Sequence, residues 1–214
     1  MEKEIKNQIL WDNFAKRNLL SSEQIDQFKK YYNLLIEHNK LYNITAITDL
    51  ESIINGHFED SLALSKAVDL NNKVIVDIGS GGGFPGIPLK IRDNSLKVVL
   101  IEVILKKVNF LETVIEELNL DNIETCNLDW RTFLRTPQEP LANKVDYFCA
   151  RASLHTDELL RLFKPSSFYK NSSLVYWASK NWNPTKEEKE LIYKTYSYQN
   201  DNKQRQLIFF KSKI

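Results

Sequence analysis

The chain has 214 residues, of which 43% are hydrophobic, enough to bury the core of one globular domain. Its 29 basic and 28 acidic residues leave a net charge of +1, which argues against attraction of nucleic acid by an overall positive field. Two cysteines, Cys126 and Cys149, are too few for a disulfide framework and lack metal-ligand spacing. Charges interrupt the apolar positions of residues 1–17, so neither a signal peptide nor a membrane span is expected, and the protein is predicted to be cytoplasmic.

The first clearly marked element is a helix that begins near Ser21. Ser21 and Gln24 have the spacing of a capping box, in which each side chain bonds the backbone N–H of the other residue. Apolar residues then recur at helical spacing, namely Ile25, Phe28, Tyr32, Leu35 and Ile36. A shorter helical stretch is expected at residues 50–68, with a break near Gly56. The front third of the chain is therefore predicted to be helical.

From residue 73 onward, short apolar runs alternate with amphipathic helical segments. The runs that predict strands are residues 74–78, 98–101, 123–126, 145–150 and 174–178. Helices are predicted at residues 106–120 and from residue 158 to residue 163. This alternation predicts an α/β fold with a doubly wound, mostly parallel sheet, and residues 191–198 and 207–211 predict an antiparallel hairpin at its edge, joined by the polar turn QNDNKQ.

The expected organisation is one compact unit. Residues 1–70 are predicted to form an N-terminal helical extension that packs on a core domain of residues 71–214. Residues 127–144 are the longest segment without a predicted element, and their TPQEP stretch is expected to be a mobile surface loop. We expect a monomer.

Five of the six glycines follow the first predicted strand, in the stretch DIGSGGGFPG: Gly79, Gly81, Gly82, Gly83 and Gly86. Glycine is used where the backbone takes positive φ or where a ligand approaches the main chain. Ligands of doubly wound sheets bind beyond the carboxyl ends of the strands, where the strand order reverses. The bend therefore predicts a cofactor site.

One cofactor class for this bend is a dinucleotide, which needs the spacing G-x-G-x-x-G. A start at Gly79 and Gly81 places Phe84 at the third glycine position. A start two residues later places Phe84 and Pro85 inside the turn, where they stiffen the backbone that must meet the phosphate. A nicotinamide-dependent oxidoreductase is therefore a strained alternative.

The other class is suggested by Asp77-x-Gly79-x-Gly81-x-Gly83, which resembles motif I of class I S-adenosylmethionine (SAM) methyltransferases. Asp77 is expected to supply negative charge near the ammonium of SAM, directly or through water. Glu102, at the end of the second predicted strand, is placed to accept hydrogen bonds from both ribose hydroxyls. The structural alternatives are that Asp77 caps the following helix and that Glu102 is a solvated strand end.

A longer pattern is more specific. DIGSGGGFPGIPLKI, preceded by LYNITAI and HFEDSL and followed by CARA, resembles the bacterial RsmG family (glucose-inhibited division protein B) from about residue 32 to residue 177. The resemblance implies a class I SAM-methyltransferase fold, Rossmann-like, and a cytoplasmic enzyme that methylates guanine N7 in the 530 loop of 16S rRNA, at position 527 in conventional rRNA numbering. The implied partner is 16S rRNA in the small ribosomal subunit or its precursor, without a membrane or a metal.

The resemblance also implies cofactor contacts at individual positions. Gly79 and Phe84 would line the SAM pocket. The family usually has an R-A-E triplet after the third strand, whose last two residues contact the cofactor. This chain has Asp129, Trp130 and Arg131 there, which is a departure. Contacts from Trp130 and Arg131 are expected through the backbone, with the indole stacked on adenine. A second departure is FYKNSS before the fifth strand, where the family usually has glycine.

Arg151, within CARA, matches the family's arginine at the site and is the one candidate for a catalytic role. Its structural alternative is an ion pair with Asp77 or Asp146. His57 and Asp60 are three residues apart and are expected to form a structural pair, with Asp60 as an N-cap, or else to line the substrate pocket. They have no third ligand at metal-binding spacing.

The absence of two motifs agrees with N7 chemistry. The chain lacks the N/D-P-P-Y/F loop typical of methylation at exocyclic amines, and neither cysteine has the Pro-Cys context of a pyrimidine-carbon methylase. Guanine N7 presents a free lone pair, so the reaction requires positioning and no general base. A non-catalytic RNA-binding relative would have the same features and remains an alternative.

Contacts to RNA are expected from a local set of basic residues, with weak binding to naked RNA and a shallow salt dependence. The candidates near the carboxyl edge and in the helical front are Arg131, Arg135, Arg151, Lys106, Lys107, Lys29, Lys30 and Lys40.

Overall fold

A computed structural model describes residues 1–137 and 144–212. Its strands are β1 (Val74–Ile78), β2 (Lys97–Ile101), β3 (Ile123–Cys126), β4 (Tyr147–Ala150), β5 (Ser173–Ser179), β6 (Ile192–Asn200) and β7 (Lys203–Phe210). They form a seven-stranded sheet in the order β3-β2-β1-β4-β5-β7-β6. The first five strands are parallel, while β7 runs antiparallel to β5 and β6 antiparallel to β7. The expected doubly wound sheet with an antiparallel edge hairpin is confirmed.

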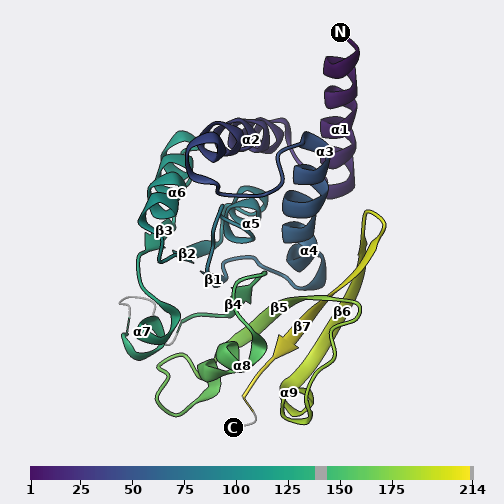
Figure 1. Ribbon diagram of the computed structural model, residues 1–214. Coiled ribbons are helices and arrows are strands. Elements are labelled where there is room, and N and C mark those ends of the chain that lie inside the picture. The colour runs from purple at the N-terminus through teal and green to yellow at the C-terminus, as the bar shows by residue number, and fades with distance from the viewer. Residues whose placement is uncertain (138–143, 213–214) are drawn as a thin grey trace.

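Helices cover both faces of the sheet. They are α1 (Glu2–Asn18), α2 (Ser22–Tyr42), α3 (Leu50–Ile53), η1 (Ile54–Glu59), α4 (Asp60–Ala67), α5 (Gly86–Arg92), α6 (Leu105–Glu117), α7 (Trp130–Arg135), α8 (Thr156–Leu159), η2 (Leu160–Phe163) and α9 (Lys186–Leu191). Figure 1 shows α2, α4, α5 and α6 above the sheet and α7 and α8 below it. Successive side chains of a strand point to opposite faces of the sheet, so the sheet has a hydrophobic core on each face. Ile75 lies in the core between the sheet and helices α1 to α6. Val74 and Val76 lie in the core between the sheet and helices α7 and η2. None of the helices in the described ranges has the length and apolar character of a membrane span.

The N-terminal helices begin where the sequence predicts. The Ser21 side chain accepts a hydrogen bond from the Gln24 backbone N–H, and the Gln24 side chain accepts one from the Ser21 N–H, so the capping box is confirmed. The Gln24 amide also donates to the carbonyls of Ile91 and Arg92, which ties the start of α2 to the end of α5. The predicted helix of residues 50–68 is continuous, because the expected break near Gly56 is a π-helical turn, η1.

Two segments differ from the prediction. The edge hairpin is longer than predicted, because the backbone pairing of β6 and β7 continues through polar residues as far as Asn200 and Lys203. The turn between the strands is therefore shorter than the expected six residues. Residues 127–144 contain a helix, α7, which Asp129 starts by accepting hydrogen bonds from the N–H groups of Arg131 and Thr132. Residues 138–140 of the expected TPQEP loop lie outside the described ranges.

An aromatic cluster docks the N-terminal helices onto the glycine-rich bend. The Phe28 ring lies 5.0 Å from both the Phe14 and Phe58 rings, and the Tyr31 ring stacks on Phe84, 5.6 Å away. The Tyr31 hydroxyl donates a hydrogen bond to the carbonyl of Gly82. The helical front therefore supports the bend directly and shares one continuous core with the sheet.

Removing one ring of this cluster tests the docking. Phe28 is fully buried, so Phe28→Ala is expected to lower the free energy of unfolding by about 3 to 5 kcal/mol, through lost burial and a cavity. The control is Ile9→Ala, because Ile9 on α1 is 53% exposed and its truncation should change stability by less than about 0.5 kcal/mol. Urea unfolding measures both. Equal losses in the two variants would contradict the docking.

Candidate functional site

A cavity of about 520 Å³ opens beyond the carboxyl ends of β1, β2 and β4, which is within the size range of cofactor sites. We call it the cofactor cavity. Its lining residues are Ile78, Gly79, Gly81, Ile101, Glu102, Val103, Lys107, Leu128, Asp129, Trp130, Arg131, Ala152, Ser153, Leu154 and Glu158. Five of the residues that the sequence predicts for cofactor contact are among them: Gly79, Gly81, Glu102, Trp130 and Arg131.

Gly79 and Gly81 leave the cavity wall without side chains for different reasons. Both have positive φ, +65° and +58°. A Cβ on Gly79 would lie 2.8 Å from the Cβ of Ser153, so glycine is required by the close approach of the segment after β4. A Cβ on Gly81 would meet no atom closer than 3.9 Å, because it would project into open space. Gly81 therefore keeps room for a ligand.

Glu102 joins the end of β2 to this bend. Its Oε2 accepts a hydrogen bond from the Gly81 N–H at 2.9 Å, and its Oε1 accepts one from the Ile104 N–H at 2.9 Å. The side chain is only 5% exposed, so it is not the solvated strand end that we considered. Each oxygen keeps a lone pair for a further hydrogen bond, and the fixed carboxylate forms a polar part of the wall.

Asp77 lies away from the cavity wall, in contrast to the direct contact that we considered. It is fully buried on the opposite side of β1, and its Oδ2 accepts a hydrogen bond from the Gly86 N–H at 2.9 Å. A Cβ on Gly86 would collide with Leu100, so this glycine lets α5 approach the sheet. Burial raises the pKa of Asp77 to about 7, against the opposing effects of the Gly86 N–H and the charge of Arg151.

Gly83 and Phe84 are also absent from the lining residues, because the chain turns inward at this point. The Phe84 ring is 5% exposed and stacks on the His57 ring, with centroids 4.4 Å apart and planes at 15°. A Cβ on Gly83 would press against Ile87 and the Tyr31 hydroxyl. The expected pocket contact of Phe84 is thus replaced by a place in the aromatic cluster.

Trp130 and Arg131 close the cavity on the side of α7. The Trp130 indole N–H donates to the carbonyl of Glu158 at 3.1 Å, and its ring packs edge-on against Phe148. The Arg131 guanidinium binds both oxygens of Glu158, at 2.8 and 2.9 Å. Hydrogen bonds from Arg131 and Arg161 hold the pKa of Glu158 at about 2.

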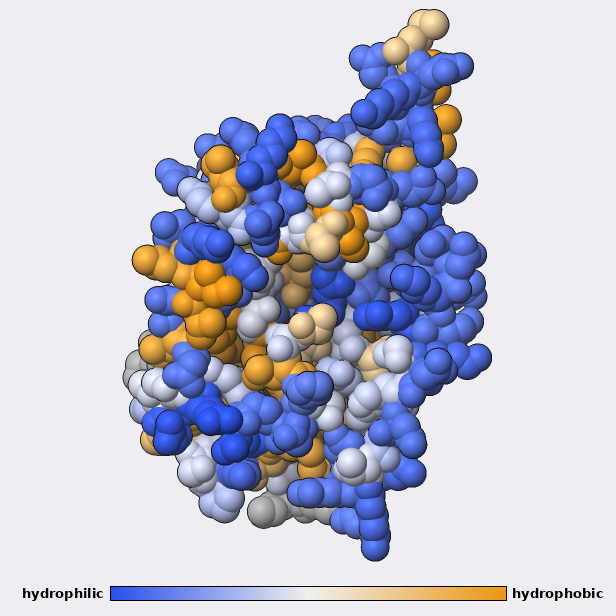
Figure 2. All heavy atoms as spheres, viewed as in Figure 1, coloured by the Kyte–Doolittle hydropathy of each residue, from blue (hydrophilic) through white to orange (hydrophobic). Residues whose placement is uncertain are grey.

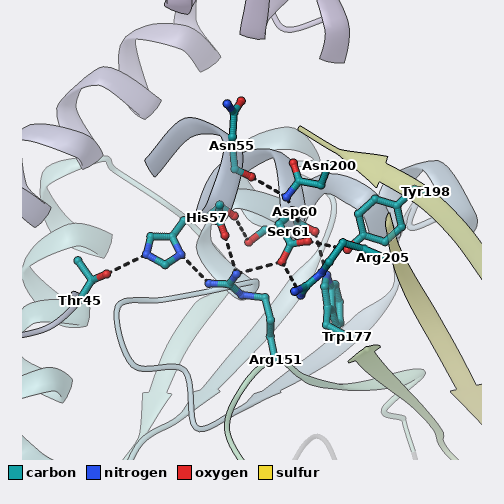
Figure 3. Close-up of polar contacts among 11 residues, drawn as sticks. Thr45, Asn55, His57, Asp60, Ser61, Arg151, Trp177, Tyr198, Asn200 and Arg205 are labelled. Carbon is teal, nitrogen blue, oxygen red and sulfur yellow. Dashed lines mark hydrogen bonds and ion pairs between the residues drawn. The ribbon is translucent and has the colours of Figure 1, made fainter. Parts of the chain in front are cut away.

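Arg151 is held by residues from η1 and α4 (Figure 3). Its Nη1 donates to the Gly56 carbonyl at 2.8 Å and to Asp60 Oδ2 at 3.1 Å, while its Nη2 lies 2.8 Å from His57 Nδ1. The ion-pair partner is therefore Asp60 and neither Asp77 nor Asp146. Asp60 is not the N-cap that we expected, because the helix continues through it from η1 into α4. Arg151 does not line the cofactor cavity.

The protonation of His57 follows from its partners. Burial, with the charge of Arg151, lowers the pKa of His57 to about 4, so the ring is neutral near pH 7. Arginine only donates hydrogen bonds, so Nδ1 must accept from Arg151 and Nε2 must carry the proton. Nε2 then donates to Thr45 Oγ1 at 2.8 Å. His57 and Asp60 are therefore linked through Arg151, as parts of a structural network.

The edge hairpin completes this network. The Tyr198 hydroxyl donates to Asp60 Oδ1 at 2.6 Å, and Arg205 Nη2 donates to Asp60 Oδ2 at 3.2 Å. The Trp177 indole donates to the Asp60 backbone carbonyl at 2.8 Å. Burial beside this carboxylate raises the pKa of Tyr198 well above its ordinary value. Tyr198 and Arg205 of the hairpin and Trp177 of β5 carry no local sequence motif for these contacts, and sequence reasoning missed them.

The remaining basic candidates are spread over the surface. Lys30 pairs with Glu117 at 2.7 Å, and Lys29 lies 3.9 Å from Asp26. Lys107 lines the cofactor cavity. In the part of the chain that the structure describes, no group of three or more His, Cys, Asp or Glu side chains could hold a metal ion. Ser153, two residues beyond Arg151 in the stretch CARAS, lines the cavity and was missed, although its motif was noted.

The raised pKa of Asp77 predicts a pH-dependent loss of stability. As pH rises above the unfolded value of 3.8, the unfolded chain loses this proton first, so the native state is progressively disfavoured until about pH 7. Asp77→Asn keeps an acceptor for the Gly86 N–H and cannot ionise. Its stability relative to the wild type should increase by about 2 to 3 kcal/mol between pH 5 and pH 8, in urea unfolding. Asp121→Asn, at an exposed position, should show no such trend, and a constant difference for Asp77→Asn would refute the assignment.

The model of the family described as rRNA small subunit methyltransferase G matches residues 24–208. Ribosomal RNA small subunit methyltransferase G of Lachnoclostridium phytofermentans is 40% identical over 147 residues, which cover 68% of this chain and 60% of the relative. The protein of that name from Carboxydothermus hydrogenoformans is 40% identical over 153 residues, covering 71% of this chain and 64% of the relative. Each match spans less than two thirds of the relative's own length.

Solved structures share the fold at low sequence identity. A SAM dependent methyltransferase from Aquifex aeolicus has a TM-score of 0.53 and 16% identity, covering 78% of this chain and 97% of that chain. M. capricolum TrmK, in complex with S-adenosyl-homocysteine, has a TM-score of 0.53 and 18% identity, covering 72% of this chain and 67% of that chain. These similarities concern the fold. Because the family model extends from residue 24 to residue 208, the chain belongs to the rRNA small subunit methyltransferase G family.

Proposed function

We propose that this protein is a SAM-dependent methyltransferase that acts on guanine N7 in the 530 loop of 16S rRNA, at position 527 in conventional rRNA numbering. It acts in the cytoplasm, as a monomer, on the small ribosomal subunit or its precursor. The observation that carries the proposal is the buried Glu102 carboxylate, fixed to the Gly81 N–H on the wall of the cofactor cavity. Membership of the family supports it.

The residues around the cavity fit SAM. Glu102 Oε1 and Oε2 each retain an acceptor site after bonding backbone N–H groups, so they suit the two hydroxyls of a ribose. The open space at Gly81 admits a ligand against the main chain. Trp130 and Val103 supply apolar surface in the same wall, where an adenine ring would be held. SAM, when bound, supplies an electrophilic methyl group.

The chain's own contribution to the reaction is positioning. Guanine N7 has a free lone pair, so no proton must be removed before it attacks. Arg151 is occupied by Gly56, Asp60 and His57, so it acts as a positioning residue that fixes the end of β4. The segment after β4 includes Ser153, which packs against Gly79 and lines the cavity. Rate enhancement would come from alignment of methyl group and base, without a general base.

Methyl transfer to ribosomal subunits tests the proposal. Small subunits from a strain lacking the gene should accept a labelled methyl group from SAM in the presence of the protein, and mass spectrometry should locate it as 7-methylguanine at position 527. Calorimetry should detect SAM binding to the protein alone. SAM binding without transfer to any rRNA would refute the substrate, and methylation at a different atom or nucleotide would refute the specificity.

Gly81→Val is predicted to abolish SAM binding, because its Cβ branches would occupy the open space of the cavity. The positive φ at this position adds about 1 to 2 kcal/mol of backbone strain, which the fold should tolerate. Asn122→Val is the matched control, because Asn122 has a φ of 55° and does not line the cavity. Calorimetry with SAM and thermal unfolding should show that both variants fold with moderate destabilisation and that binding is lost in Gly81→Val alone. Unchanged affinity in Gly81→Val would contradict this placement.

A further inference from the structure

Next to the cofactor cavity lies a second, smaller cavity, of about 300 Å³, between α7 and the segment that follows α8. We call it the basic cleft, and its lining residues are Arg131, Leu134, Arg135, Arg161, Lys164, Ser166 and Ser167. Figure 2 shows the deep blue of the most hydrophilic residues gathered over α7, at the lower left of the molecule. Arg161 and Lys164 were not recognised from the sequence.

The basic cleft holds more positive charge than its surroundings neutralise. Arg131 and Arg161 share one carboxylate, Glu158, with an Nε to Oε1 distance of 2.8 Å in both pairs. Arg135 and Lys164 have no carboxylate partner among the described residues. Among the described residues, the four cations thus share one ion-paired carboxylate, Glu158, with Asp129 near Arg131 and Arg135 as a second acid, on a chain whose overall charge is only +1. The excess is a local property of this cleft.

The charged side chains that line the cleft carry hydrogen-bond donors beyond those that the contacts above use. Guanidinium and ammonium groups donate hydrogen bonds and accept none. Arg135 uses its Nε for the Arg131 carbonyl at 3.1 Å, and the outer edge of its guanidinium has no hydrogen-bond partner within residues 1–137 and 144–212. Ser167 accepts a hydrogen bond from the Tyr169 N–H at 3.1 Å, so its own proton can be donated into the cleft. Such a set of donors is suited to an anion with several oxygen atoms, above all a phosphate.

Glu158 holds two of these cations in place. Its pKa of about 2 keeps it ionised, and it binds Arg131 through two atoms and Arg161 through Nε. The Arg161 side chain is 40% exposed, and its terminal nitrogens, without a partner among the residues that the structure describes, are open to a ligand. Less side-chain freedom is lost when an anion binds to groups that are already ordered.

We propose that the basic cleft binds a backbone phosphate of the substrate RNA while the target base lies at the cofactor cavity. Arg131 lines both cavities, and Glu158, which lines the cofactor cavity, is the partner of Arg131 and Arg161. A strand whose base enters the cofactor cavity therefore has the cleft beside it. This inference rests on the proposed function, since it names a contact for the same RNA. The phosphate contact fixes the register of the RNA and reads no sequence.

The test removes two charges from the cleft and two from a distant surface. The double variant Arg135→Gln, Lys164→Gln leaves the cofactor cavity and the Glu158 pairs intact. The control, Lys186→Gln and Lys189→Gln on α9, has the same change in net charge at exposed positions. Binding of both to small subunits from the deletion strain is measured between 0.05 and 0.3 M salt, and SAM affinity is measured by calorimetry.

The cleft variant should bind small subunits about tenfold more weakly at about 0.1 M salt, with the slope of log K against log salt reduced by about 1. The control variant should keep the wild-type slope, and both should keep wild-type SAM affinity. The inference is overturned if the wild type methylates the subunit but the cleft variant binds the subunit as tightly as the control variant does. The proposed function would then remain intact.

Two further results would also overturn it. One is a wild type that binds SAM but no ribosomal RNA, in which case the proposed function fails with it. The other concerns inorganic phosphate, whose binding is followed by phosphorus NMR. In this result the wild type binds phosphate and the cleft variant does not, yet the two proteins bind RNA equally well. That result would assign the cleft to a free phosphate.

Discussion

Two hydrogen bonds from the backbone of the glycine-rich bend to buried carboxylates set the geometry on which the site depends. The Gly81 N–H binds Glu102 and the Gly86 N–H binds Asp77, so the bend is fixed to the ends of two neighbouring strands. Gly79 and Gly81 leave the cavity side of this bend without side chains, while Phe84, between the two anchors, turns inward to the aromatic cluster. The cofactor cavity exists because the bend is both rigid and bare.

A third buried carboxylate, Asp60, joins parts of the chain that are far apart in sequence. It receives Arg151 from the end of β4 and Arg205 and Tyr198 from the edge hairpin. A buried charge of this kind is tolerated only when it is paired and hydrogen-bonded, and here two cations and a hydroxyl surround it. The network also contacts the bend, because the Arg151 guanidinium lies 5.4 Å from the centroid of the Phe84 ring. It therefore supports the bend on the side that faces the N-terminal helices.

Local patterns in the sequence predicted the strands and their parallel direction, and they indicated a cofactor site at the end of β1. Period-two and helical spacings depend only on neighbouring residues, so the alternation of strands and helices could be predicted, as could the start of α2 at its capping box. The glycine-rich bend after β1 and Glu102 after β2 mark strand ends, and parallel strand ends meet at one edge of the sheet. α7 was missed because its apolar face is short, although Asp129 provided the signal for its start.

Tertiary structure decided which side chains meet. Asp60 and Arg205 are 145 residues apart, and nothing local to either position indicates the other. The inward turn of Phe84 and the burial of Asp77 depend on the helices that cover the bend. The basic cleft likewise forms where α7 meets the segment after α8. Sequence periodicity records which face of an element is apolar, whereas partners from distant segments become visible only when packing brings those faces together.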